Sequence, residues 1–178
     1  MKFFVLISAI LCSLSTSLLA QEAKFHIIKG FGGIYEIQNA VLPSPDMEYK
    51  IVIDLKTLQR DKESLNPGLN NVARMINLHG LGGVKAENLK VAVVIHGGAT
   101  DVILNNEAYK KRYELDNPNI ELIATLKKAG VEVFVCGQSL LGRKYANSEV
   151  NSDVKIGLSM LTVFTTYMHK GYQPLVFN

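Results

Sequence analysis

The order of apolar and polar residues predicts an α/β fold, a Rossmann-like three-layer domain with a mostly parallel sheet of about five strands. Short runs rich in Val, Ile and Leu alternate along the chain with helical patterns. The central runs are almost continuously apolar, which is typical of strands buried on both faces of a parallel sheet. Glycine marks many of the junctions, as expected for tight turns between strands and helices.

The predicted strands are β-rich runs bounded by turn residues. The best of them is LKVAVVIH, which ends directly before Gly97 and Gly98. We expect strands at residues 49–55, 89–96, 131–136, 154–157 and 173–177.

The predicted helices carry apolar residues at a spacing of three and four. In the first, Asn66 is placed to cap the amino end, Pro67 suits the first helical position, and glycines after residue 79 end the helix. The others are expected over residues 105–115, 117–129, 137–145 and 159–170, the second of these capped by Asn117.

The first 20 residues have the pattern of a secretory signal peptide. Lys2 precedes an apolar run, and Ala20 provides a small residue for cleavage. A retained membrane anchor is the alternative, but it needs about 20 strongly apolar residues, and four hydroxyl residues fall within positions 13–17. We therefore expect a signal peptide at 1–20, an extended arm at 21–48 and an α/β domain at 49–178. The mature protein would be periplasmic or secreted, without stable membrane insertion.

Composition excludes several classes of protein. The chain has 178 residues, of which 48% are hydrophobic and 20% charged, enough for one domain with a real core. The 19 basic and 16 acidic residues give a net charge of +3, too even for a nucleic-acid-binding surface. Two cysteines exclude a disulfide scaffold and a four-cysteine zinc site. Cys12 lies in the predicted signal peptide, so Cys136 is the single thiol of the mature chain.

Cys136 is the sharpest candidate for a catalytic residue. It ends a predicted strand, and ligands of open parallel sheets bind beyond the carboxyl ends of the strands. A helix is expected to begin immediately after it, and a thiol at a helix amino terminus is favoured as thiolate. The alternative is a buried, structural cysteine that fills space in the core.

His96 ends another predicted strand and is the second catalytic candidate, as a base or proton partner for the thiol. If the two strands are neighbours, His96 and Cys136 share one edge of the sheet. The alternative is a turn histidine bonded to backbone. Gly97, Gly98, Gly137 and Gln138 are candidates for contacts to an anion or a sulfur-containing ligand, although the loops match neither the dinucleotide fingerprint nor the phosphate loop.

No metal and no cofactor are expected. His79, His96 and Cys136 come from separate elements without the spacing of metal ligands. The zinc-protease, CxxC, serine-elbow and EF-hand patterns do not occur in the sequence.

Three segments of the sequence resemble the DsrE/DsrF-like family, and the resemblance covers roughly residues 49–177. They are NPGL…R…NLH at 66–79, LKVAVVIHG at 89–97 and VFVCGQS at 133–139. The resemblance implies a Rossmann-like domain assembled as a homotrimer, hexamer or related ring. It also implies a sulfurtransferase subunit that carries sulfur as a cysteine persulfide, with Cys136 at the position of the relay cysteine. The relays of the family are cytoplasmic, whereas this chain has the pattern of an exported protein, so the sulfur donor and acceptor stay open.

The sequence and the family resemblance lead to three hypotheses for the function. The first is an exported sulfur carrier or sulfurtransferase-like protein that uses Cys136, with a donor or acceptor protein or a small sulfur species as partner. The alternative is a non-catalytic oligomeric module that binds a ligand or partner and in which Cys136 is structural. A redox sensor that pairs Cys136 between two subunits is the third.

Overall fold

Five parallel strands form one sheet in the order β4-β3-β2-β1-β5. The computed structural model describes residues 22–178, so the predicted signal peptide lies outside the described residues. The sheet confirms the predicted α/β class, and within the described residues every strand pair of the sheet is parallel.

The strands lie close to the predicted positions. Their bounds are β1 Tyr49–Leu55, β2 Leu89–Ile95, β3 Glu132–Cys136, β4 Lys155–Gly157 and β5 Gln173–Phe177. Because all strands are parallel, their carboxyl ends lie along one edge of the sheet.

The helices also follow the predicted pattern. Their bounds are α1 Pro67–Leu81, α2 Asn106–Tyr113, α3 Ile120–Lys128, α4 Gly137–Arg143 and α5 Met160–His169. Asn66 caps α1 as predicted, with its side chain accepting from the backbone N–H of Leu69 at 2.9 Å. Three short 3₁₀ helices complete the set: η1 Ala86–Asn88, η2 Gly97–Ile103 and η3 Asn147–Glu149.

The structure differs from the sequence prediction at two turns. The residues after His96 form η2 and not an open glycine loop. The cap position of α3 is Asn119, so the prediction of Asn117 was wrong. The Asn117 side chain instead donates to the backbone oxygens of Val102 and Leu104, at 2.8 and 2.7 Å, and thereby ties η2 to the start of α3.

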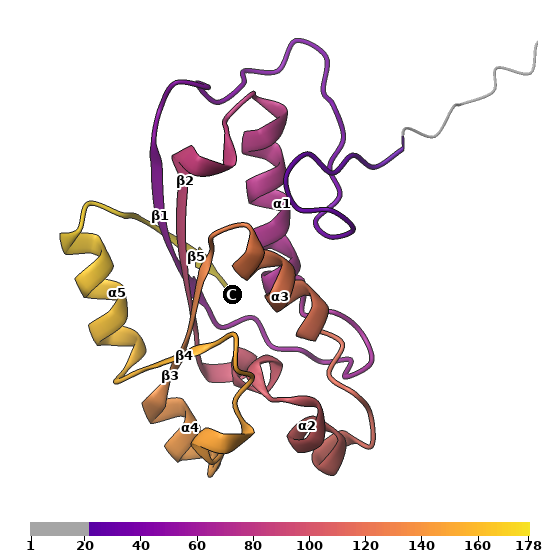
Figure 1. Ribbon diagram of the computed structural model, residues 1–178, viewed down its shortest axis with the longest axis vertical. Coiled ribbons are helices and arrows are strands. Elements are labelled where there is room, and N and C mark those ends of the chain that lie inside the picture. Colours follow the sequence, from indigo (N-terminus) through magenta and orange to yellow (C-terminus); the bar gives the residue numbers. More distant parts are fainter. Residues whose placement is uncertain (1–21) are drawn as a thin grey trace, which may run out of the picture.

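Helices cover both faces of the sheet and complete the three layers (Figure 1). The main core lies between the sheet and α1 and α3, where Val93 and Ile95 of β2 are fully buried against Leu69 and Leu126. On the other face α5 packs against the sheet through Tyr167, over a second cluster of buried residues: Val52, Ala92 and Val94.

The segment before β1 lies on α1 of its own chain. The buried side chain of Asn77 in α1 accepts from the backbone N–H groups of Ile27 and Ile28 and donates to the oxygens of Ile28, Phe31 and Gly32. Gly32 has φ of +61°, and a Cβ there would lie 2.2 Å from the backbone nitrogen of Arg74. A glycine is therefore required where this arm touches the helix.

Candidate active site

Asp54, His96 and Cys136 lie at the carboxyl ends of three adjacent strands, β1, β2 and β3. In the register of the sheet Ile95 pairs with Val135, so His96 and Cys136 follow directly at the ends of neighbouring strands. Because β2 and β3 are neighbours in the sheet, His96 and Cys136 share one edge, as the sequence predicts for neighbouring strands. In Figure 1 this edge is the end of the sheet near α4 and α2.

His96 is held by a carboxylate from the neighbouring strand. Its Nε2 lies 2.5 Å from Oδ1 of Asp54, and its backbone N–H donates to the oxygen of Leu55 at 3.0 Å. Both side chains are largely buried, with 19% of the His96 and 14% of the Asp54 side chain exposed. A carboxylate in this position orients the imidazole ring. Sequence reasoning missed Asp54, whose only signal was an acidic residue near the end of a mostly apolar strand.

Cys136 is the residue before α4, but its polar neighbours come from two helices. Its thiol donates to Oγ of Ser159, the cap residue of α5, over 4.0 Å. Burial raises the pKa of the thiol, while hydrogen bonds from the Met160 backbone N–H, from Ser139 and from Ser159 lower it, so that the net pKa is below that of an ordinary cysteine. The local sequence pointed to α4 alone, because Ser159 and Met160 lie more than 20 residues further along the chain.

Little of Cys136 reaches the surface. The residue is 5% exposed, and the start of α4 packs closely against the end of β4. A Cβ on Gly137 would lie 2.8 Å from the backbone oxygen of Gly157, so this glycine makes room for the chain itself. A thiol with so small an opening reacts only with groups that reach into it.

The other predicted contact residues also touch their own chain. Gln138 donates to the backbone oxygen of Leu158 at 3.3 Å. A Cβ on Gly98 would lie 3.1 Å from the backbone oxygen of Lys56, and Gly97 has φ of +54° with Lys56 beside it. Gly97, Gly98, Gly137 and Gln138 therefore lie around Cys136 and His96. They pack against their own chain and do not form an open anion loop.

Ser139 connects the two strand ends. Its hydroxyl accepts from the backbone N–H of Gly97 at 3.4 Å and also contributes a hydrogen bond to Cys136. Among the described residues, no direct hydrogen bond joins His96 to Cys136. The site therefore consists of a carboxylate–histidine pair and a thiol of lowered pKa at the ends of neighbouring strands.

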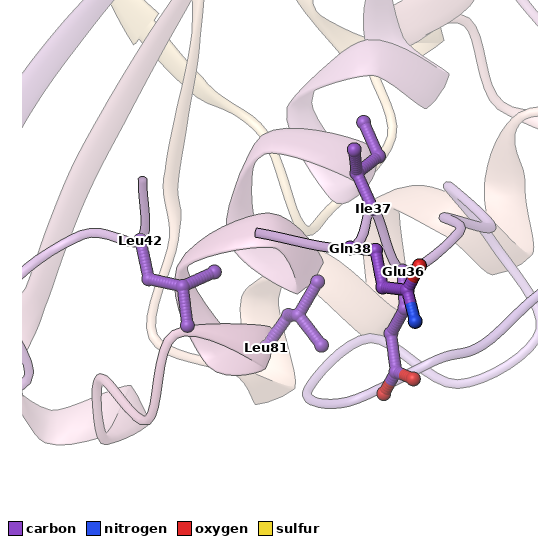
Figure 2. A pocket seen from close by; sticks show the side chains of 5 residues that line it. All are labelled: Glu36, Ile37, Gln38, Leu42 and Leu81. Atoms are coloured by element: carbon purple, nitrogen blue, oxygen red, sulfur yellow. The ribbon is translucent and has the colours of Figure 1, made fainter. Parts of the chain in front are cut away.

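Two open cavities lie at the opposite, amino-terminal edge of the sheet. One, of about 600 Å³, lies between the arm and the end of α1, and Figure 2 shows Leu42 and Ile37 of the arm on either side of Leu81. The other, of about 710 Å³, is lined by residues at the start of β1 and β5, including Tyr49 and Leu175. Neither is lined by a cysteine, and the one histidine that lines them, His79, bonds the backbone oxygen of Met75 at 2.8 Å. His96 and Cys136, the candidate residues of the site, lie instead at the carboxyl edge.

Residues 22–178 contain neither a group of metal ligands nor a helix that could span a membrane. They hold no cluster of three or more His, Cys, Asp or Glu side chains suited to a metal ion. None of the helices in this part of the chain is long and apolar enough to cross a membrane.

Comparisons with known proteins place the fold in a family. The chain is similar to the protein of unknown function MTH1491 from Methanobacterium thermoautotrophicum, with 14% identity, a TM-score of 0.54, and coverage of 72% of this chain and 99% of that one. It is also similar to the ychN protein from E. coli, with 22% identity, a TM-score of 0.53 and the same coverage. No curated protein matches the chain. The model of the DsrE/DsrF-like family matches residues 50–177, and the chain therefore belongs to this family.

Proposed function

We propose that this protein is an exported sulfur carrier that holds sulfane sulfur as a persulfide on Cys136. The observation that carries the proposal is the environment of the thiol, at the carboxyl edge of the sheet, with three hydrogen-bonding groups that lower its pKa. A lowered pKa increases the fraction of thiolate, which is the nucleophile in sulfur exchange. Membership of a sulfur-relay-type family supports the same chemistry.

The proposed step transfers one sulfur atom without net oxidation. The Cys136 thiolate attacks the outer sulfur of a donor persulfide, R–S–SH. A bond forms between Sγ and that sulfur while the S–S bond of the donor breaks. The donor leaves as a thiolate and is protonated to R–SH, and Cys136 becomes a persulfide.

His96 supplies the proton chemistry of this step. It ends the strand next to that of Cys136, and Asp54 orients its ring through the contact of 2.5 Å. In the proposed reaction His96 takes up the thiol proton of Cys136 and returns it to the leaving sulfur. Asp54 stabilises the imidazolium that forms between these two transfers.

The proposal places the protein outside the cytoplasm. Its support is the sequence of residues 1–20, with Lys2, an apolar run and Ala20 at the expected cleavage position. Mass spectrometry of the protein recovered from a periplasmic extract tests this, with an amino terminus at Gln21 as the expected result. An intact amino terminus in the membrane fraction would contradict it.

We further propose that the carrier is a homo-oligomer, a trimer or hexamer, that packs through α5. Leu161 and Met168 of α5 are 67% and 44% exposed, and Val176 of the edge strand β5 is 52% exposed. Exposed apolar groups on one side of a domain favour association with another copy. Light scattering during gel filtration is expected to give a multiple of the monomer mass, and Leu161→Glu is expected to reduce it. A monomer for both proteins would contradict the proposal.

Persulfide formation is tested directly by mass spectrometry. The protein is incubated with a polysulfide or with thiosulfate, and the peptide that contains Cys136 is analysed. We expect an adduct with the mass of one sulfur atom on this peptide, released by a thiol reductant and absent from Cys136→Ser. An unmodified Cys136 peptide in the folded wild-type protein would refute the sulfur-carrier function.

The second candidate, a non-catalytic module that binds a partner, is favoured by the surface beside the thiol. Leu141, Leu158 and Leu161 are 72%, 73% and 67% exposed and belong to the segments that pack around Cys136. Under this function Cys136→Ala keeps the oligomeric state and partner binding. Rapid labelling of the native protein by a small thiol reagent would argue against it.

A further inference from the structure

Asp101 is the most highly connected buried carboxylate among the described residues. It belongs to η2 and is 4% exposed. Its two oxygens accept four hydrogen bonds, from Lys62 at 2.8 Å, Tyr113 at 2.6 Å, Arg143 at 2.9 Å and Tyr145 at 2.8 Å. Burial raises the pKa of Asp101, but the bonds from Lys62, Tyr113 and Tyr145 outweigh burial and hold its pKa below the ordinary value. Asp101 is therefore a fixed negative charge on which four side chains converge.

Arg143 links Asp101 to α4. It is the last residue of α4, and its guanidinium reaches Asp101 with one nitrogen and the backbone oxygen of Gly97 with the other, at 2.7 Å. The carboxyl end of α4 is thus fixed to η2 at two positions, Gly97 and Asp101. A bidentate guanidinium sets direction as well as distance, which a lysine ammonium does not.

The other end of α4 is tied to the same segment. Ser139, in the first turn of α4, accepts from the backbone N–H of Gly97. The same serine contributes hydrogen bonds to the sulfur of Cys136. Gly97 therefore links the anchored end of the helix with the end that faces the thiol.

We propose that Asp101 is a positioning residue for the Cys136 site, which acts through Arg143 to hold α4 and Ser139 against the sulfur. Asp101 itself makes none of the contacts that act on the thiol. Its role for sulfur chemistry rests on the proposed function, but its effect on the thiol is measurable without any sulfur transfer. Loss of the anchor lets α4 turn, weakens the Ser139 contact and makes the thiolate less stable.

The test is the pH dependence of Cys136 alkylation by iodoacetamide, followed by mass spectrometry of the Cys136 peptide. The variants are Arg143→Lys, which keeps the charge and loses the bridge, and Asp101→Asn. The matched control is Asp153→Asn, because Asp153 also accepts from a lysine, Lys127 at 2.7 Å, but lies before the amino end of β4. The loss of a carboxylate–lysine contact is thereby placed away from the thiol and from the two helices that contact it.

We expect both variants to shift the midpoint of the profile upward by about half to one pH unit, with alkylation below the midpoint about three- to tenfold slower. The limiting rate at high pH stays within about twofold, since the thiolate itself is unchanged. Asp153→Asn keeps the wild-type midpoint.

A wild-type midpoint in Arg143→Lys would overturn the proposal. Arg143→Lys decides the question even if Asp101→Asn fails to fold, because the Arg143 side chain is 35% exposed and tolerates substitution. The two proposals can fail separately. If the variants shift the midpoint but the wild-type protein forms no persulfide, the positioning role is supported and the sulfur-carrier function is refuted.

Discussion

Nε2 of His96 and Oδ1 of Asp54 lie 2.5 Å apart, across two neighbouring strands at the carboxyl edge of the sheet. The contact leaves the other ring nitrogen of His96 free of any hydrogen bond within residues 22–178. A histidine with one nitrogen held by a carboxylate and the other available is a suitable acid–base group. Under the proposed function, the pair serves thiol chemistry because His96 ends the strand next to that of Cys136.

The first prediction concerns this pair. We expect Asp54→Asn to slow persulfide formation on Cys136 by tenfold or more, because general acid–base groups contribute about 10²–10⁴ in rate and the amide cannot stabilise the imidazolium. The rate is measured by mass spectrometry with a polysulfide donor.

A double-mutant cycle provides the control. If Asp54 acts through His96, the variant Asp54→Asn/His96→Gln is no slower than His96→Gln alone. Fully additive losses in rate would contradict the coupling.

The second prediction concerns the pH at which Cys136 reacts. Its lowered pKa means that alkylation rises with pH through a midpoint below that of an ordinary cysteine. Ser159→Ala removes one of the groups that lower the pKa, so its midpoint moves upward. The exposed Ser152 provides the control, and Ser152→Ala keeps the wild-type midpoint. A wild-type midpoint at or above that of a free cysteine would contradict the described environment.

Local patterns in the sequence were sufficient for the fold but only for part of the site. β1 and β5 begin and end as predicted, because β-rich runs between turn residues are local signals. Cys136 and His96 were found because strand ends are also local. Asp54, Ser159 and Asp101 were missed because their roles depend on which strands are neighbours and on contacts between residues 23 to 42 positions apart. No periodicity in one sequence encodes such distances.

The third prediction concerns stability in acid. Because the pKa of Asp101 is lowered in the folded protein, the unfolded chain binds this proton more readily. The contribution of Asp101 is therefore complete above its ordinary pKa of about 3.9 and is lost as the pH falls through the lower, folded value. We expect Asp101→Asn to lower the free energy of unfolding at pH 7 by about 2 kcal/mol and to flatten its decline below about pH 4. Urea unfolding at several pH values measures both effects.

Asp153→Asn is the control for this loss. Asp153 pairs with Lys127 at 2.7 Å in a contact whose lysine is 56% exposed. Exposed pairs contribute little, so we expect a loss of about 0.5 kcal/mol or less at pH 7. Equal losses for Asp101→Asn and Asp153→Asn would contradict the anchoring role of Asp101.

The fourth prediction concerns the arm on α1. Gly32→Ala places a methyl group where the Arg74 backbone nitrogen would lie 2.2 Å away, at a residue with φ of +61°. The arm must therefore leave the helix, and the contacts of Asn77 are lost with it. We expect the free energy of unfolding to fall by about 3 kcal/mol and proteases to cut residues 22–45 much faster.

Gly30→Ala is the control that separates the loss of the arm's contact with α1 from backbone strain, because Gly30 has φ of +80° but no neighbour within 4 Å of the added carbon. This variant should lose only about 1 kcal/mol and keep the arm protected, since the strain of a left-handed residue is its only cost. Equal proteolysis of the two variants would show that the arm is not held by its contact with α1.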